Sequence, residues 1–167
     1  MIRAGGADRP LPGDGADAAD LADLECAACR TPGVRLFTIL AWVDDRAALH
    51  RVYSNMPQAY PLSGEKVMPR DAPWIGQVVI AQRPYLGRDA AAVAAVFSDH
   101  ALIASLGCGA VINLPVIDGG RTLGVLNLLA AEGAYDEESL TAALPLAVYA
   151  APALRRWHAG TGRGSLT

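Results

Sequence analysis

The sequence lacks the features that mark several special classes of protein. Among its 167 residues no apolar run approaches the ~20 needed to span a bilayer, so we expect no membrane segment. The N-terminus is rich in Gly, Asp and Pro and has no apolar core of a secretory signal. Three cysteines cannot pair completely, and without a signal they are more simply reduced thiols than a disulfide framework. These absences together predict a cytoplasmic protein.

Basic residues are also few and scattered. The 14 Lys and Arg occur singly or in pairs against 17 Asp and Glu, which gives a formal net charge of −3. There is no basic stripe with interleaved aromatic residues of the kind that follows a phosphate backbone. We therefore expect no direct binding of nucleic acid.

The composition that remains is that of a globular domain. Hydrophobic residues make up 52% of the chain and charged residues 19%. A chain of this length buries one substantial core without added cross-links. We expect a disordered leader at 1–15, one domain at 16–158 and a disordered tail at 159–167, with no internal repeat.

The first third of the chain predicts a helix followed by a β-hairpin. Residues 17–29 carry apolar side chains at helical spacing, with acids enriched near the start as the helix dipole prefers. Residues 34–43 are rich in β-branched and aromatic side chains and predict a buried strand. Residues 48–55 alternate well enough to be its hairpin partner.

The middle of the chain is less regular. Residues 56–70 contain three prolines and a glycine, and loops longer than ~12 residues are commonly functional lids or binding loops. Residues 71–79 predict a short helix that starts at an Asp cap with proline in the first turn. A short strand follows, and residues 90–107 predict one or two helical segments closed by glycine.

The last third gives the clearest local signal. Residues 110–131 contain two apolar, β-rich runs joined by an Asp-Gly-Gly turn cluster, which predicts a hairpin. Residues 135–158 begin with three acids and continue at helical spacing. They predict a long helix with a bend near Pro145 or Pro152.

This order, together with SLGCGAVINLPVIDGGRTLGVLNLLAAEGAYDEES, resembles a GAF domain. The matching features are a strand with a Pro-Val step, an Asp/Gly turn, the Gly-Val-Leu of 124–126 and the acidic helix start at 136–138. The resemblance covers about residues 17–158. It implies an α+β fold, in which the N- and C-terminal helices pack on one face of a central antiparallel β-sheet. Loops and short helices would then cover a small-molecule pocket on the other face.

The resemblance implies a sensory or regulatory module, and fold alone does not choose its ligand. Ligands in that family include cyclic nucleotides, tetrapyrroles, haem, amino acids and small effectors, so the cofactor is left unspecified. We expect the ligand to be a small polar or anionic metabolite. We also expect a homodimer formed through the terminal helices, because Ala/Leu-rich helices with an apolar outer face otherwise favour aggregation. We expect no output domain after His158, because nine residues of this sequence follow it. The alternatives are a small enzyme on the same scaffold and a purely structural partner subunit.

Cys108 is the candidate for enzymatic chemistry, with His100 as candidate base eight residues upstream. One single-domain branch of the family, the free methionine-(R)-sulfoxide reductases, uses a cysteine just before the corresponding strand, further cysteines in the preceding loop and carboxylates in the next strand. In this chain the loop has no cysteine, and Asn127 and Leu128 stand where acids are wanted. That chemistry is poorly supported, and burial as a small hydrophobe is the simpler role for Cys108.

Cys26 and Cys29 form a Cys-x-x-Cys pair. A zinc site needs about four ligands, and no second pair follows. A redox pair gains its low pKa at a helix N-terminus, whereas this pair is near a predicted C-terminus. We therefore expect no metal site and predict packing in a core or an interface.

The long loop and the strands beside it supply the candidate ligand-binding residues. Aromatic rings form rigid apolar walls, a lysine can hold an anion, and amides both donate and accept hydrogen bonds. Asn113 and Asn127 are nearly equidistant from the predicted turn, so they should be cross-strand neighbours that either pair with each other or contact the ligand. A solvated loop whose aromatic residues cover the sheet is the alternative. The full set is Tyr53, Asn55, Tyr60, Lys66, Trp74, Asp99, His100, Cys108, Asn113 and Asn127.

Overall fold

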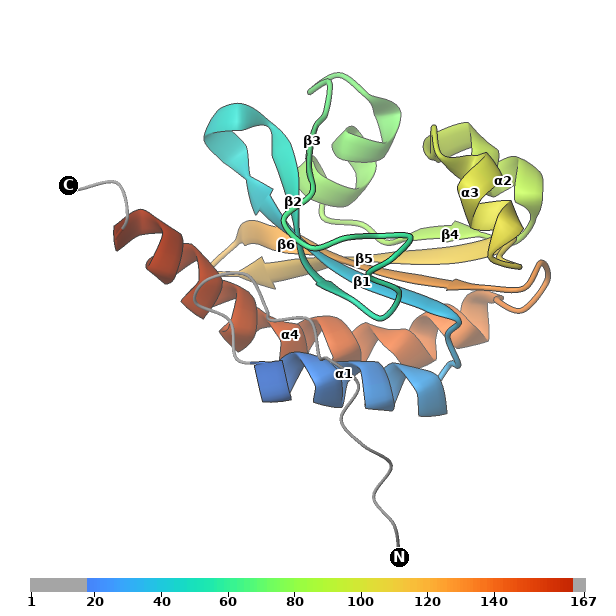
Figure 1. Ribbon diagram of the computed structural model, residues 1–167. Coiled ribbons are helices and arrows are strands. Elements are labelled where there is room, and N and C mark those ends of the chain that lie inside the picture. Colours follow the sequence, from blue (N-terminus) through green and yellow to red (C-terminus); the bar gives the residue numbers. More distant parts are fainter. Residues whose placement is uncertain (1–17, 164–167) are drawn as a thin grey trace, which may run out of the picture.

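The computed structural model describes residues 18–163, whose elements follow the predicted order of helix, hairpin, loop with short helices, hairpin and helix (Figure 1). The expected leader at 1–15 lies outside the described residues. The helical elements are α1 (Ala18–Arg30), the 3-10 turn η1 (Asp44–Arg46), the π-helix η2 (Ile75–Ile80), α2 (Ala90–Val96), α3 (His100–Ser105) and α4 (Glu137–Arg163). The strands are β1 (Leu36–Val43), β2 (Ala48–Ser54), β3 (Glu65–Val67), β4 (Tyr85–Gly87), β5 (Ala110–Asp118) and β6 (Arg121–Ala130).

The strands form one antiparallel sheet in the order β3-β2-β1-β6-β5-β4. Pairing of β1 with β6 joins the two predicted hairpins into this sheet. Figure 1 shows α1 and α4 side by side on one face, with η2, α2 and α3 over the other. This is the α+β arrangement expected from the sequence.

Side chains of β1 point alternately to the two faces of the sheet and so contribute to an apolar core on each face. Phe37 and Ile39 are fully buried in a core shared with α1 and α4. Thr38 and Leu40 face the opposite side, toward the short helices. The core on this face contains more buried apolar residues than the two clusters on the other face together. Since burial of a Phe or Ile side chain is worth about 1.5–3 kcal/mol, this face supplies most of the apolar stabilisation. The apolar residues of α1 that predicted a helix are all buried in that layer.

A β-bulge in β2 interrupts the alternation on the neighbouring strand. Leu40 lies opposite Arg51. The preceding residue, Ile39, lies opposite Tyr53, which leaves Val52 as an extra residue in β2. A bulge of this kind changes the face that the following side chains take. Arg51 and Tyr53 therefore lie on opposite faces of the sheet, although they are two residues apart.

The C-terminal helix is longer than expected. It continues past residue 158 to Arg163, so the predicted start of a disordered tail at residue 159 is wrong for residues 159–163. The side chain of Trp157 is buried, and the Thr161 hydroxyl donates to its carbonyl oxygen at 3.3 Å, which supports a further turn. Both Pro145 and Pro152 lie inside this helix. No helix within residues 18–163 has the length and apolar character needed to cross a membrane.

Candidate functional site

A cavity of about 180 Å³ lies on the face of the sheet opposite α1 and α4. Its floor comes from β1, β2 and β6, and its sides come from residues 60–74 and from the connection between α2 and α3. Aliphatic and aromatic side chains make up about half of the lining. The polar and titratable side chains that line it are Thr38, Arg51, Tyr60, Glu65, Lys66, Trp74, Asp99 and Asn127.

The volume of the cavity limits the size of what it can enclose. An engineered protein cavity of about 150 Å³ holds one benzene molecule, whereas pockets for drug-sized ligands have about 300–1,000 Å³. This cavity is close to the first value. It matches a metabolite of about the size of a small organic acid and does not enclose a tetrapyrrole.

Arg51 is the most buried positive charge of the cavity wall. Its guanidinium carbon lies 5.0 Å from the centroid of the Tyr60 ring, and its Nη1 donates to the carbonyl oxygen of Pro61 at 3.0 Å. The Nε atom is buried and has no hydrogen-bond partner among the described residues. Burial lowers the pKa of Arg51, but a guanidinium stays charged at neutral pH. An unpaired buried donor costs about 1–3 kcal/mol, which favours an acceptor nearby.

Two side-chain hydrogen bonds close the rim between the long loop and the α2–α3 connection. The Tyr60 hydroxyl donates to Asp99 Oδ2 at 2.5 Å, and Lys66 Nζ donates to Ser98 Oγ at 3.2 Å. Burial, followed by the hydrogen bond to Asp99, raises the pKa of Tyr60 well above its usual value. Tyr60 therefore stays neutral and keeps the donor that holds the rim closed.

A chain of four buried polar side chains, which we call the amide ladder, crosses the sheet beneath the cavity. Trp74 Nε1 donates to Asn113 Oδ1 at 3.0 Å, and Asn113 Nδ2 donates to Asn127 Oδ1 at 2.6 Å. Asn127 Nδ2 then donates to Thr38 Oγ1 at 3.2 Å. Asn113 lies directly opposite Asn127 in the register, which confirms the predicted cross-strand pair.

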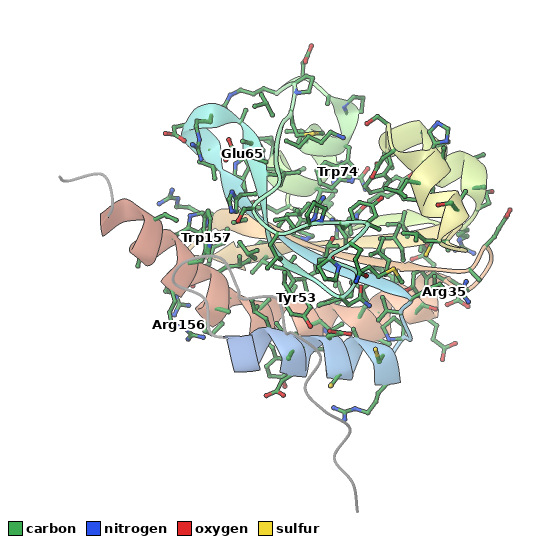
Figure 2. The ribbon with its side chains drawn as sticks, in the orientation of Figure 1. Arg35, Tyr53, Glu65, Trp74, Arg156 and Trp157 are labelled. Atoms are coloured by element: carbon green, nitrogen blue, oxygen red, sulfur yellow. The ribbon has the colours of Figure 1, made fainter. Side chains whose placement is uncertain are left out.

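Half of the predicted ligand-binding residues meet at this cavity. The elements that carry them are the long loop, η2 with the turn before it, the α2–α3 connection and β6. Asn113 is fully buried and joins this group through the amide ladder. Figure 2 shows Trp74 above the sheet, on the side of the short helices. The residues that line the cavity are Tyr60, Lys66, Trp74, Asp99 and Asn127.

Two other predicted ligand-binding residues make structural hydrogen bonds at the sheet instead. Tyr53 lies on the helical face because of the bulge, where its hydroxyl donates to Glu25 of α1 (Figure 2). The side chain of Asn55 continues the pairing of β2 at the N-terminal end of β1. Its Oδ1 accepts from the backbone nitrogen of Phe37 at 2.8 Å, and its Nδ2 donates to the carbonyl oxygen of Arg35 at 3.0 Å. Neither side chain lines the cavity.

The two candidates for catalysis also lie outside the lining. Cys108 is buried in an apolar cluster behind the cavity wall, and burial raises the pKa of its thiol. His100 is exposed at the start of α3. The glycines beside Cys108 have structural causes: Gly107 has a φ of +78°, and a Cβ on Gly109 would lie 2.9 Å from Glu132 Cβ. Close packing therefore accounts for the Gly-Cys-Gly sequence.

Two residues of the cavity were missed from the sequence. Arg51 lies in the predicted hairpin partner at 48–55 and Thr38 in the predicted buried strand at 34–43, but neither is among the predicted ligand-binding residues. The alternation of Leu49 with Arg51 is the signal that could have placed the arginine, because Leu49 lines the same cavity. Thr38 gave no comparable signal, since threonine is common in strands.

The Cys-x-x-Cys pair lies on the surface of α1. Cys26 and Cys29 are exposed free thiols, so they do not pack in the core as one of the two predicted roles required. Cys29 is still partly shielded from water, and this partial burial, together with the nearby Glu25, raises the pKa of its thiol. Within residues 18–163, no group of three or more His, Cys, Asp or Glu side chains could hold a metal ion.

Comparison with known proteins gives one family. A family model described as a GAF domain matches residues 16–155. No curated protein matches the chain.

Solved structures share the fold at low sequence identity. The GAF domain of a two-component sensor histidine kinase from Bacillus halodurans is 10% identical, with a TM-score of 0.66 over 84% of this chain and 95% of that chain. A GAF domain/HD domain protein from Geobacter sulfurreducens is 11% identical, with a TM-score of 0.65 over 84% and 93%. The GAF domain of a phosphoenolpyruvate-protein phosphotransferase from Coxiella burnetii is 16% identical, with a TM-score of 0.59 over 88% and 86%.

Proposed function

Because the chain belongs to the GAF domain family, whose members are sensory and regulatory ligand-binding modules, we propose that it binds a small anionic metabolite. The proposed site is the cavity of about 180 Å³ on the face of the sheet opposite α1 and α4. Its apolar lining would bury the body of the ligand, and its few polar groups would fix the orientation.

The observation that supports this proposal most directly is that the guanidinium of Arg51 lacks a close ion-pair partner. Among residues 18–163 it makes no ion pair within 4.0 Å, and its Nε lacks a hydrogen-bond partner. Two carboxylates also line the cavity: Asp99 accepts from Tyr60 and its charge favours the charged form of Arg51, and Glu65 pairs with Arg46 at 3.0 Å. Lys66 adds a second positive charge at the rim. An anionic ligand could form the close ion pair that the guanidinium lacks among the described residues, and a guanidinium is suited to carboxylate and phosphate groups.

The proposal is tested by a panel of small metabolites scored by melting temperature. A ligand present at 100 times its dissociation constant stabilises the folded state by about 2.7 kcal/mol. For a domain of this size that corresponds to a rise of roughly 5–10 °C. Anions should dominate the compounds that raise the melting temperature. A panel that produced no shift would contradict the proposal.

A pair of arginine variants locates the site. Arg51→Met keeps the apolar length of the side chain and removes the charge, so it should abolish the shift produced by an anionic ligand. Arg88→Met is the matched control, since Arg88 pairs with Glu137 at 3.4 Å on the exposed surface and neither residue lines the cavity. Binding that survives in Arg51→Met and is lost in Arg88→Met would place the ligand elsewhere.

We also propose that the protein is a homodimer formed through its terminal helices. The outer face of α4 exposes large apolar side chains, with exposed fractions of 44% at Leu144, 73% at Val148 and 71% at Tyr149. Leu144 and Val148 are four residues apart and lie on the same face of the helix, and Tyr149 borders that face, so the three give an apolar strip. A second copy that packs its own α4 against this strip would remove it from water.

Two narrower points follow from the cysteines. All three are free thiols, which supports a cytoplasmic location. The enzymatic alternative is disfavoured by the position of Cys108, because the thiol is buried behind the cavity wall and its raised pKa reduces the thiolate that chemistry would need.

A further inference from the structure

The direction of the amide ladder defines the chemistry of the cavity floor. We propose that the floor is a surface of hydrogen-bond donors and that the ligand is a small monocarboxylate whose carboxylate lies on Thr38 and Asn127 beside Arg51. This inference rests on the proposed function and narrows its ligand class.

The indole of Trp74 fixes the direction of the ladder at one end. An indole N–H can only donate a hydrogen bond, so the side chain of Asn113 must present its oxygen to Trp74. The amide nitrogen of Asn113 then faces Asn127 at 2.6 Å, and only the oxygen of Asn127 can accept from it. A reversed amide at either position would oppose two donors or two acceptors and cost about 1–3 kcal/mol.

The other end of the ladder leaves donors without acceptors. The nitrogen of Asn127 faces Thr38 at 3.2 Å, so the Thr38 hydroxyl oxygen accepts and its proton must go elsewhere. Asn127 also has a second amide N–H. Neither donor has an acceptor among the described residues, and both side chains line the cavity. Their exposed fractions are only 4% and 5%, and because both line the cavity, the small surface that each keeps is the part a ligand could contact.

Arg51 lies on the same floor as these donors. It sits opposite Leu40, which is two residues from Thr38 on the cavity face of β1. Neighbouring strands are about 4.8 Å apart and two residues along a strand span about 6.7 Å, so the backbones of Thr38 and Arg51 lie about 8 Å apart. The long side chain of Arg51 can cover much of that separation, so a carboxylate over Thr38 would accept from the floor and face the guanidinium.

The same floor should reject the uncharged relatives of such an acid. A primary carboxamide has one oxygen but also an NH₂ group, and that group would meet a donor of the floor. It also lacks the charge that Arg51 favours. Sites built for one hydrogen-bonding pattern discriminate strongly against a ligand that leaves their buried groups unpaired. The aliphatic residues around the floor, Leu36 and Leu129 among them, would contact the apolar body of the acid.

Matched acids and amides test the proposal by calorimetric titration at pH 7. The probes are benzoate with benzamide and isovalerate with isovaleramide, whose size suits the cavity. The wild-type protein should bind at least one acid at least tenfold more tightly than its amide. Equal affinity for acid and amide would overturn the proposal and leave the binding function standing. Failure of all four probes to bind would also overturn it, while the wider metabolite panel separately decides the proposed function.

Two tryptophan variants separate the ladder from general packing. Trp74→Phe removes the donor that fixes Asn113, so the ladder is free to reverse and the preference for the acid should fall at least fivefold. Trp42→Phe is the matched control. Trp42 is buried in the same apolar cluster and its indole donates to Asp44 at 3.2 Å, outside the ladder. An equal effect of the two variants on the preference would contradict the proposal.

Thr38→Val provides a test that does not depend on a tryptophan. Valine has nearly the same shape as threonine but lacks the hydroxyl, so affinity for the acid should fall at least fivefold and affinity for the amide should change less. Thermal unfolding of each variant confirms that it is folded. Unchanged affinity of folded Thr38→Val for benzoate and isovalerate would exclude Thr38 from the floor and overturn the proposal.

Discussion

Gly124 of β6 shows how closely the sheet is packed at the level of a single residue. A Cβ atom there would lie 2.1 Å from the carbonyl oxygen of Leu40 and 2.9 Å from a methyl carbon of Leu154. The first of these atoms belongs to the backbone and cannot move aside easily.

We predict that Gly124→Ala destabilises the fold by at least ~1–3 kcal/mol, the usual cost of overpacking a core. The midpoint of urea unfolding measures the change. Gly76→Ala is the control, because a Cβ at Gly76 meets no atom within 4 Å and alanine is the better helix former. A midpoint that falls as far for Gly76→Ala as for Gly124→Ala would show that the clash is not the cause.

The thiols should differ in reactivity with pH. Burial raises the pKa of Cys108, so at a given pH it has less thiolate than an ordinary cysteine, and its alkylation should accelerate only well above pH 8.5. Cys26 is exposed and should react first with iodoacetamide at pH 7.5. Mass spectrometry of the labelled peptides measures both rates. Fast labelling of Cys108 at pH 7.5 would restore it as a reactive group.

At the scale of elements, the segment at 56–70 and the α2–α3 connection close the cavity through few contacts. Tyr60→Phe removes the hydrogen bond to Asp99, which we expect to cost about 1–3 kcal/mol of local stability because the acceptor is a carboxylate. Amide hydrogen exchange should accelerate in residues 56–67 and 98–105, and affinity for the ligand should fall. Tyr85→Phe is the control, since Tyr85 donates to a backbone carbonyl of α2 and does not line the cavity. Exchange that is unchanged in Tyr60→Phe would show that other contacts close the rim.

Periodicity predicted the elements well, because each hairpin and both terminal helices carry a regular apolar pattern that a single sequence displays. The pairing of Asn113 with Asn127 was also predictable, since distance from a tight turn sets the register of a hairpin. The face of Tyr53 was not predictable. One extra residue at Val52 reverses the alternation, and its position depends on the pairing of β1 with β2, which no local pattern reveals.

The roles of Thr38, Arg51 and Asn55 depend on contacts far apart in the sequence. Thr38 meets Asn127 only because β1 pairs with β6. Arg51 becomes a cavity residue only because the loop folds back over β2. Asn55 looked like a ligand-binding amide, but its side chain completes the backbone pairing of β1. In these cases the residue type predicts which hydrogen bonds or charges the side chain can offer, but only the tertiary structure determines which partner it meets.

At the scale of the whole molecule, the proposed homodimer would depend on the outer face of α4. We predict that Val148→Glu combined with Tyr149→Glu converts a dimer into a monomer, because two charges cannot be buried unpaired in an apolar interface. Light scattering after size-exclusion chromatography measures the mass. Ile80→Glu is the control, since Ile80 is 63% exposed but lies on η2, on the other face of the sheet. A wild-type protein of monomeric mass at micromolar concentration would contradict the proposed homodimer.

The two-faced character of β1 also bears on how occupancy could be sensed. Thr38 lies on the cavity side, and its immediate neighbours Phe37 and Ile39 lie in the core against α1 and α4. A ligand that shifts Thr38 would therefore also shift the neighbouring residues of β1, whose side chains pack against α1 and α4. We expect the effect of ligand binding to reach α1 and α4 through β1, as a change in the twist of this strand and not as a hinge motion between domains.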